Sequence, residues 1–324
     1  MRIRGCRGRL GRVRISSELD TRRPFPRWRA IAAGLGRATL DGPGFRRVLY
    51  GVLVAADVPD SPQLRAEAAL TCFFASALAS HKTAARLWRV PVSLPPGEDV
   101  TVPEVGHRLR RAGVTCHVRA ATEVVVIGGV RVSTLPDLFV ELASVLPLVE
   151  LVVAGDWMVR RHRVRPSALI AAASHAGGRA GALARSAATY VRELVDSPME
   201  TRLRMLLVLA GIPEPEINLE IRTVDGEVLR RYDLSWPGVR VIVEYDGRHH
   251  VERVEQWEAD LARREAIDDS EWRILVIVSS GIYKSPGSTV QRVHDLLRRR
   301  GLVGLPAQPR EDWRPHFPGW SDAA

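Results

Sequence analysis

Lysine is nearly absent from this chain of 324 residues, which contains Lys82 and Lys284 and no other lysine. Cysteine is also scarce: Cys6, Cys72 and Cys116 form no Cys-x-x-Cys pair. That spacing argues against a structural zinc site and against a disulfide framework. Few, unpaired cysteines fit a reducing compartment, so we predict a cytoplasmic protein.

Long apolar runs are missing as well. The best candidate, residues 145–154, is shorter than the roughly 18 residues that a membrane span needs, and Pro147 and Glu150 interrupt it. Residues 1–14 hold six arginines but no apolar core, so they do not form a secretory signal. What remains is a globular composition, with 46% apolar and 26% charged residues. The length favours two or three domains.

Positive charge is in excess. The formal net charge is +10 and the sequence pI is near 10.4, and arginine supplies almost all of the cations. A basic chain favours a polyanionic partner, and guanidinium groups suit bidentate contact with phosphate. The charge therefore predicts a polyanionic partner, and a nucleic acid such as DNA becomes the expected partner only together with the motifs described below.

The pattern of apolar residues and turn residues predicts an α/β protein with five segments. A strand or a hairpin wing is expected at 45–54 and an apolar helix at 63–79. We place a basic, disordered extension at 1–24, an α+β region at 25–132, a helical connector at 133–195, an α/β domain at 196–303 and a tail at 304–324.

The α/β domain has the predicted order α-β-β-β-α-β-α. Its first helix begins with a capping box, because Ser197 suits the N-cap, Pro198 the first turn and Glu200 the third helical position. It ends at Gly211. The later elements are strands at about 216–223, 227–234, 239–246 and 272–278, with helices at about 254–268 and 288–300.

Acidic residues stand inside the apolar strands of this domain. Alternation puts Glu244 and Asp246 on one face of the strand 241–246, and a hairpin through residues 235–238 brings Asp233, at the end of the preceding strand, beside Glu244. Buried carboxylates need compensation, and converging oxygens suit a hard cation such as Mg²⁺ or Mn²⁺. The alternative is an ion-pair network, for example of Arg230 or Arg231 with Glu244.

Further polar residues surround this acidic centre. Glu200 serves the cap and can also point at the cation. His249 and His250 follow the strand, and one of them, with His249 preferred, can act as general acid or base. Arg263 and Arg264 on the next helix can contact phosphate, while Asp260 and Arg264 are spaced to pair with each other.

These residues resemble a family. The segments 197–204, 233–237 and 243–247, with His249, His250 and 260–264, are similar to an uncharacterised family related to the very-short-patch-repair endonuclease. That family belongs to the PD-(D/E)xK, restriction-endonuclease-like superfamily. The resemblance implies a restriction-endonuclease-like α/β domain with a mixed central sheet.

The resemblance also implies roles for the acidic residues. Asp233 and Glu244 would bind Mg²⁺, with Glu200, Asp246 and a histidine supporting hydrolysis of a phosphodiester. The superfamily's catalytic lysine is replaced here by Asp246. The repair endonuclease is similar in lacking that lysine and in using histidine near the site.

The region before this domain resembles the AbiEi-type antitoxin region, on residues 30–35, 45–52 and 80–88. The resemblance implies a winged-helix-like, DNA-binding α+β region. Two hypotheses result. The first is a metal-dependent DNA endonuclease acting in repair, restriction or phage defence. The second is a non-catalytic, antitoxin-like regulator with a degenerate nuclease fold and a protein partner from a toxin–antitoxin or defence system.

Overall fold

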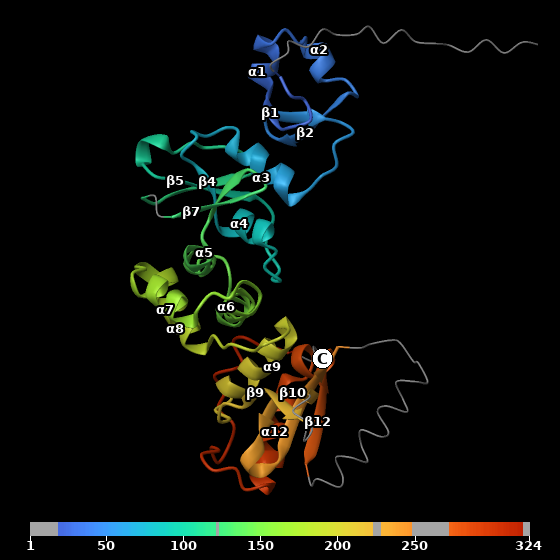
Figure 1. Cartoon of the computed structure of the whole chain (residues 1–324), viewed down its shortest axis with the longest axis vertical. Helices are drawn as coiled ribbons and strands as arrows, with labels where there is room; N and C mark the ends of the chain where they lie inside the picture. The colour runs from blue at the N-terminus through green and yellow to red at the C-terminus, as the bar shows by residue number, and fades with distance from the viewer. Residues whose placement is uncertain (1–18, 121–122, 223–227, 248–271, 320–324) are drawn as a thin grey trace, which may run out of the picture. The chain divides into compact units, whose positions relative to one another are not determined.

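The computed structural model describes residues 19–120, 123–222, 228–247 and 272–319, and its secondary structure is mixed α/β (Figure 1). The described residues fall into two compact units. Unit 1 comprises residues up to 89 together with 94–134, and unit 2 comprises residues 90–93 together with those from 135 onward. The predicted helical connector and the predicted α/β domain therefore belong to one compact unit.

Unit 1 begins earlier than residue 25. Leu19 is buried, and the carbonyl of Thr21 accepts a hydrogen bond from the backbone N–H of Ala55 at 2.8 Å. The side chain of Leu19 packs in a cluster with Phe25 and Leu53. The predicted extension thus has structure from residue 19 onward, and residues 1–18 lie outside the described residues.

Two small sheets organise unit 1. The first has the strand order β1-β3-β2 and the second has the order β6-β5-β4-β8-β7. The elements are β1 (Phe25–Pro26), α1 (Arg27–Ala32), α2 (Arg37–Leu40), β2 (Phe45–Leu49), β3 (Val52–Ala55), α3 (Pro62–Leu70), β4 (Leu78–Ala79), α4 (His81–Trp88), β5 (Glu98–Val102), η1 (Val105–His107), β6 (Val114–Val118), β7 (Val124–Ile127) and β8 (Val130–Ser133).

Of the two alternatives expected at 45–54, the hairpin is confirmed, because β2 and β3 pair antiparallel around Tyr50 and Gly51. The predicted helix at 63–79 is wrong in its second half: α3 ends at Leu70, and residues 78–79 form strand β4. An apolar run alone does not distinguish a buried helix from a buried strand. Here β4 pairs with both β5 and β8, and those long-range pairings decide the outcome.

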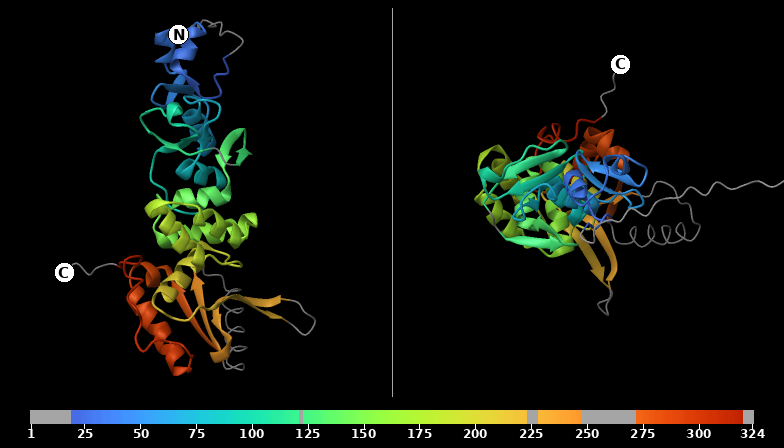
Figure 2. Two further views of the ribbon diagram at one scale, coloured as in Figure 1. Left: turned by 90° about the vertical axis from the view of Figure 1, so that its left-hand side faces the viewer. Right: turned by 90° about the horizontal axis from the view of Figure 1, so that it is seen from above.

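Unit 2 contains a group of helices followed by a four-stranded sheet. Figure 2 shows the hairpin of β9 and β10 extending away from the rest of this unit. The elements are α5 (Leu135–Leu142), α6 (Leu148–His162), α7 (Pro166–Ser174), α8 (Gly178–Tyr190), α9 (Pro198–Leu209), β9 (Glu216–Arg222), β10 (Val228–Trp236), η2 (Pro237–Val239), β11 (Val241–Asp246), β12 (Arg273–Val278), α11 (Ser279–Tyr283) and α12 (Pro286–Arg299).

The sheet of unit 2 has the order β12-β11-β10-β9. The three predicted consecutive strands are confirmed as β9, β10 and β11, which pair antiparallel in a meander. Strand β12 adds to β11 in parallel, so the sheet is mixed. The turn after β10 comes later than predicted, because Ser235 and Trp236 still pair with β11. Trp236 is buried and its indole N–H donates to the carbonyl of Pro213 at 2.9 Å. The predicted helix at 254–268 lies outside the described residues.

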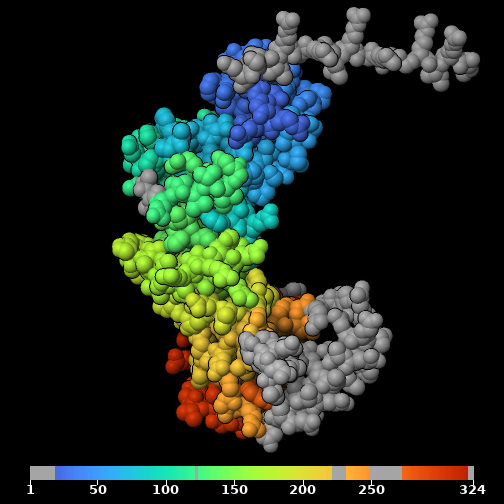
Figure 3. Space-filling model, viewed as in Figure 1, coloured from blue at the N-terminus to red at the C-terminus, as the bar shows by residue number. Residues whose placement is uncertain are grey.

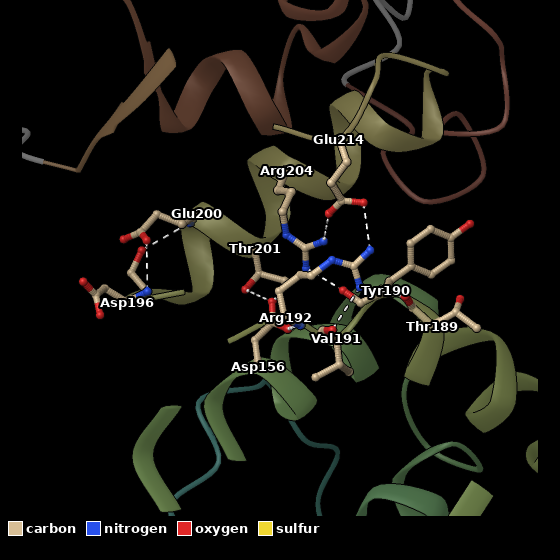
Figure 4. A network of polar contacts seen from close by, with 11 residues as sticks. Asp156, Thr189, Tyr190, Val191, Arg192, Asp196, Glu200, Thr201, Arg204 and Glu214 are labelled. Atoms are coloured by element: carbon tan, nitrogen blue, oxygen red, sulfur yellow. Dashed lines mark hydrogen bonds and ion pairs between the residues drawn. The ribbon is translucent and has the colours of Figure 1, made fainter. Parts of the chain in front are cut away.

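Helix α9 is the central helix of unit 2. The helix is packed on most of its faces, because its buried side chains include Leu203, Met205, Leu206 and Leu207. A polar network on the same helix is equally buried. Arg204 is fully buried, and its guanidinium contacts Asp156 of α6 at 2.9 Å, the carbonyl of Tyr190 at 2.8 Å and Glu214 at 2.9 Å (Figure 4).

The segment predicted as a tail packs against unit 2. Trp313 and Phe317 are buried, and the backbone N–H of Arg310 donates to the carbonyl of Ala210 at 2.8 Å. A ring nitrogen of the buried His294 lies 2.8 Å from the carbonyl oxygen of Pro306. Among the described residues, no helix is long and apolar enough to cross a membrane.

Candidate functional site

The register of β10 and β11 brings two predicted acidic residues face to face. Leu234 pairs with Val243, and continuing the same antiparallel register puts Asp233 opposite Glu244. Asp233 lies inside β10 rather than at its end, since the strand continues to Trp236. The carboxylate of Asp233 bends back onto β11, where its Oδ2 accepts the backbone N–H of Tyr245 at 2.8 Å.

The environment of Asp233 opposes its ionisation. Burial, together with the charges of Glu244 and Asp196, raises the pKa of Asp233 to about 6, against the lowering effect of the Tyr245 N–H. Two carboxylates that disfavour each other's charge in a low-dielectric setting form a site that a cation would stabilise.

Glu200 is the third acid of this cluster, and it also caps α9. The Ser197 hydroxyl oxygen accepts the backbone N–H of Glu200 at 3.2 Å. The Glu200 carboxylate accepts the backbone N–H of Asp196 at 3.0 Å, one residue before the N-cap position expected for a capping box. Burial and the charge of Asp233 raise the pKa of Glu200, so the cap and the acidic centre share this carboxylate.

Substituting Glu200 separates its two roles. Glu200→Gln keeps an oxygen that can accept the Asp196 N–H but removes the charge, so we expect unchanged thermal stability and weaker binding of Mn²⁺. Glu200→Ala removes both, and we expect an additional loss of about 1 kcal/mol in the free energy of unfolding. Calorimetric titration with Mn²⁺ and thermal unfolding of both variants check this. Equal Mn²⁺ affinity in Glu200→Gln and the unaltered chain would confine Glu200 to capping.

Asp196 belongs to the same cluster, and the sequence pattern did not single it out. Its carboxylate bridges Arg160 of α6 at 2.5 Å and Arg231 of β10 at 3.1 Å. Arg231 also pairs with Glu220 at 2.8 Å. The alternative that pairs Arg231 with Glu244 is therefore wrong, and the Arg230 side chain is outside what the structure describes. The available signal was Asp196 directly before the Ser-Pro start of α9.

Asp246 stands at the last position of β11. Burial and then the charge of Asp246 raise the pKa of the Tyr245 phenol, whereas the charges that raise the pKa of Asp233 come from Glu244 and Asp196. Asp246 pairs in register with Val278, so the beginning of α11 lies at the same edge of the sheet.

Four predicted site residues are outside the part of the chain that the structure describes: His249, His250, Arg263 and Arg264. Lys284 lies directly after α11 and is exposed. The cluster that the structure brings together is thus Asp233, Glu244 and Glu200, with Asp196 behind them. We call these four residues the acidic cluster.

The acidic cluster supplies oxygen donors of the kind that Mg²⁺ binds. Within the described ranges, no three or more histidine, cysteine, aspartate or glutamate side chains are already arranged to hold a metal ion. Mg²⁺ does not need such a set, because it commonly takes one or two carboxylates and keeps several waters or phosphate oxygens. The facing carboxylates of Asp233 and Glu244, crowded enough to raise a pKa, fit that requirement.

The raised pKa of Asp233 sets the expected pH dependence of cation binding. Only the ionised carboxylate binds the cation, so Mn²⁺ affinity should fall as the pH drops through about 6. The stability of the metal-free chain should move in the opposite direction. The folded state takes up the proton at about 6 and the unfolded state near 3.8, so Asp233 favours folding as the pH falls between those values.

Mn²⁺ titrations and urea unfolding at pH 5, 6 and 7 measure both trends, with Asp233→Asn as the variant that lacks the titrating group. An Mn²⁺ affinity that does not change over this range would contradict the assignment of Asp233 as a ligand.

Comparison with known proteins gives sequence relatives without an assigned activity. No protein-family model matches the chain. The uncharacterized proteins MT2308 and Rv2248, from two strains of Mycobacterium tuberculosis, are each 29% identical to it over 265 residues, which cover 81% of this chain and 95% of theirs. The crystal structure of the RV2827C protein from the same species matches 56% of this chain and 74% of its own at 14% identity, with a TM-score of 0.37. At that score and identity, the likeness establishes neither a shared fold nor a shared function.

Proposed function

We propose that unit 2 is a metal-dependent DNA endonuclease that hydrolyses phosphodiester bonds with Mg²⁺ or Mn²⁺. The observation that supports this most is the facing pair of Asp233 and Glu244, in which burial and mutual repulsion raise the pKa of Asp233. The net charge of +10 favours association with a polyanion. We also propose that this domain has a restriction-endonuclease-like fold and that the protein acts in DNA repair, restriction or phage defence.

Three residues of the acidic cluster have distinct parts in this proposal. Asp233 and Glu244 would hold the cation, and the Tyr245 N–H fixes the orientation of the Asp233 carboxylate. Glu200, with its raised pKa, can hold or release a proton beside them. When bound, the cation would supply Lewis-acid stabilisation of charge on the phosphate and lower the pKa of a water molecule.

The decisive test is cleavage of supercoiled plasmid DNA by the purified full chain with Mg²⁺ or Mn²⁺. Even outer-shell partners of a metal site cost 10–100-fold when mutated, so Asp233→Asn and Glu244→Gln should each lower the cleavage rate by at least about a hundredfold. Glu216→Gln, which alters an exposed acid on the neighbouring strand β9, is the matched control and should cleave normally. Cleavage that survives both substitutions, or that is absent from the unaltered chain, overturns the proposal.

A second candidate function is a non-catalytic, antitoxin-like DNA-binding regulator. The observation that favours it is Asp246 at the position where the superfamily has its catalytic lysine. DNA binding in a gel-shift assay that needs no divalent cation and is unchanged by Asp233→Asn, together with no cleavage, would support this candidate over the first.

A further inference from the structure

Unit 1 contains a pocket of about 400 Å³, which is independent of the acidic cluster and of the proposed nuclease function. The pocket is formed by the chain around Leu19–Phe25, by Arg29 of α1, by the end of α3 with the loop that follows it, and by the turn between β7 and β8. In Figure 3 the blue surface at the start of unit 1 lies next to the green surface from the region of β7 and β8. Its volume falls in the range of small-molecule sites.

The inner wall of this pocket is apolar and partly aromatic. Phe25, which is buried, and Phe73, which is partly buried, both line it. Phe74 keeps 54% of its surface exposed, and its ring lies 4.4 Å from the ring of His107. An exposed phenylalanine at the mouth of a pocket offers a face on which a flat ring can stack.

The pocket is lined by three arginines and two acids, which gives it a net charge of +1. Glu67 pairs with Arg23 at 3.2 Å and accepts from Gln63 at 3.0 Å, while the Asp20 carboxylate accepts the neutral backbone N–H of Arg22 at 2.9 Å and keeps its negative charge. The exposed side chains of Arg29 and Arg131 have no hydrogen-bond or ion-pair partner within the described residues. Two unpaired guanidinium groups match the charge of a phosphate dianion and can bind it in a bidentate manner.

From the apolar wall and the two unpaired guanidinium groups, we propose that this pocket binds a nucleoside monophosphate. The base would stack against Phe74 and the phosphate would contact Arg29 and Arg131. A small effector bound beside α1 would give the chain a ligand site separate from its acidic cluster.

Isothermal titration of the full chain with AMP, adenosine and inorganic phosphate tests this inference. We expect AMP to bind with a Kd below 1 mM, and adenosine and phosphate each to bind at least about tenfold more weakly, because each probe lacks one half of the contacts. A DNA oligonucleotide with and without a 5′-phosphate distinguishes a free nucleotide from a strand end. Arg29→Ala/Arg131→Ala is expected to weaken AMP binding and to leave the affinity for both oligonucleotides unchanged, and a loss confined to the phosphorylated oligonucleotide overturns the small-ligand assignment.

Substitutions of residues that line the pocket test whether AMP binds there. Arg29→Ala and Arg131→Ala change exposed side chains, so both should fold normally and should weaken AMP binding about tenfold each. Phe74→Ala should weaken AMP but leave the weak affinity for phosphate unchanged. Arg110→Ala, which alters an exposed arginine of the same unit outside the pocket, is the control and should bind AMP normally. No AMP binding up to 1 mM, or binding that persists in the Arg29→Ala/Arg131→Ala double variant, overturns the inference.

Discussion

Replacing Arg204 by methionine is expected to lower the free energy of unfolding of unit 2 by about 3–5 kcal/mol. Arg204 is fully buried and Asp156 is 2% exposed, so the substitution would leave a carboxylate in the core without its cationic partner. Burial already raises the pKa of Asp156, and the Arg204 charge is the largest effect that opposes this rise. Thr201 and the backbone N–H of Arg192 donate to the same carboxylate and cannot neutralise it.

Urea unfolding followed by circular dichroism measures this effect. Arg160→Met is the matched control, because Arg160 loses only its partly exposed pair with Asp196, for which we expect a loss below about 1 kcal/mol. If Arg204→Met proved no more destabilising than Arg160→Met, the buried network would not be what holds α6 and α9 together.

Acid is expected to destabilise unit 1 through His81, by about 1.4 kcal/mol for each pH unit below 6.5 until the pH approaches 3. The His81 ring is 9% exposed and stacks on His117, with ring centroids 3.7 Å apart. Burial, together with the charges of His117, Arg119 and Lys82, lowers the pKa of His81 to about 3, against the opposing effect of Asp99.

The sign of this pH effect follows from the pKa of His81 in the folded and the unfolded states. Below pH 6.5 the unfolded chain binds a proton on His81 that the folded chain does not accept until about pH 3, so protons favour unfolding in this window. The pKa of Asp99, which His117 and Lys82 contact, is lowered below 3.8 and therefore acts at lower pH.

Hydrogen exchange of the α4 and β5 segments between pH 7 and pH 4.5, corrected for intrinsic rates, reports this loss. His81→Asn is the informative variant, because asparagine tolerates the positive φ of 44° at this position and does not titrate. The acid-dependent loss should disappear in His81→Asn and persist in His175→Asn, an exposed histidine of unit 2. An unchanged pH dependence in His81→Asn would remove His81 as the cause.

Local patterns predicted much of the fold. The meander of unit 2 was predictable because its strands alternate or carry continuous apolar residues between clear turn residues, and the hairpin of β2 and β3 for the same reason. The end of α3 was not, because the strand character of Leu78 and Ala79 depends on partners that are distant in sequence. Neither Arg204 nor His81 had a local signal, since their burial depends on Asp156 and His117, 48 and 36 residues away.

The candidate site, like the fold, could be predicted only in part from the sequence. The pairing of Asp233 with Glu244 follows from strand register, which the sequence carries locally. Asp196 escaped prediction because its importance comes from two arginines on separate elements, Arg160 and Arg231. Glu200 had a capping signal, and its electrostatic coupling to Asp233 emerges only when α9 packs on the sheet.

The central claim is that Asp233 and Glu244 hold a divalent cation between them. Anomalous diffraction from crystals of the full chain soaked with Mn²⁺ at neutral pH tests it most directly. We predict an anomalous peak within bonding distance of both carboxylates, which is lost in crystals of Asp233→Asn. A fully ordered site without such a peak at saturating Mn²⁺, or a peak that persists in Asp233→Asn, would contradict the account.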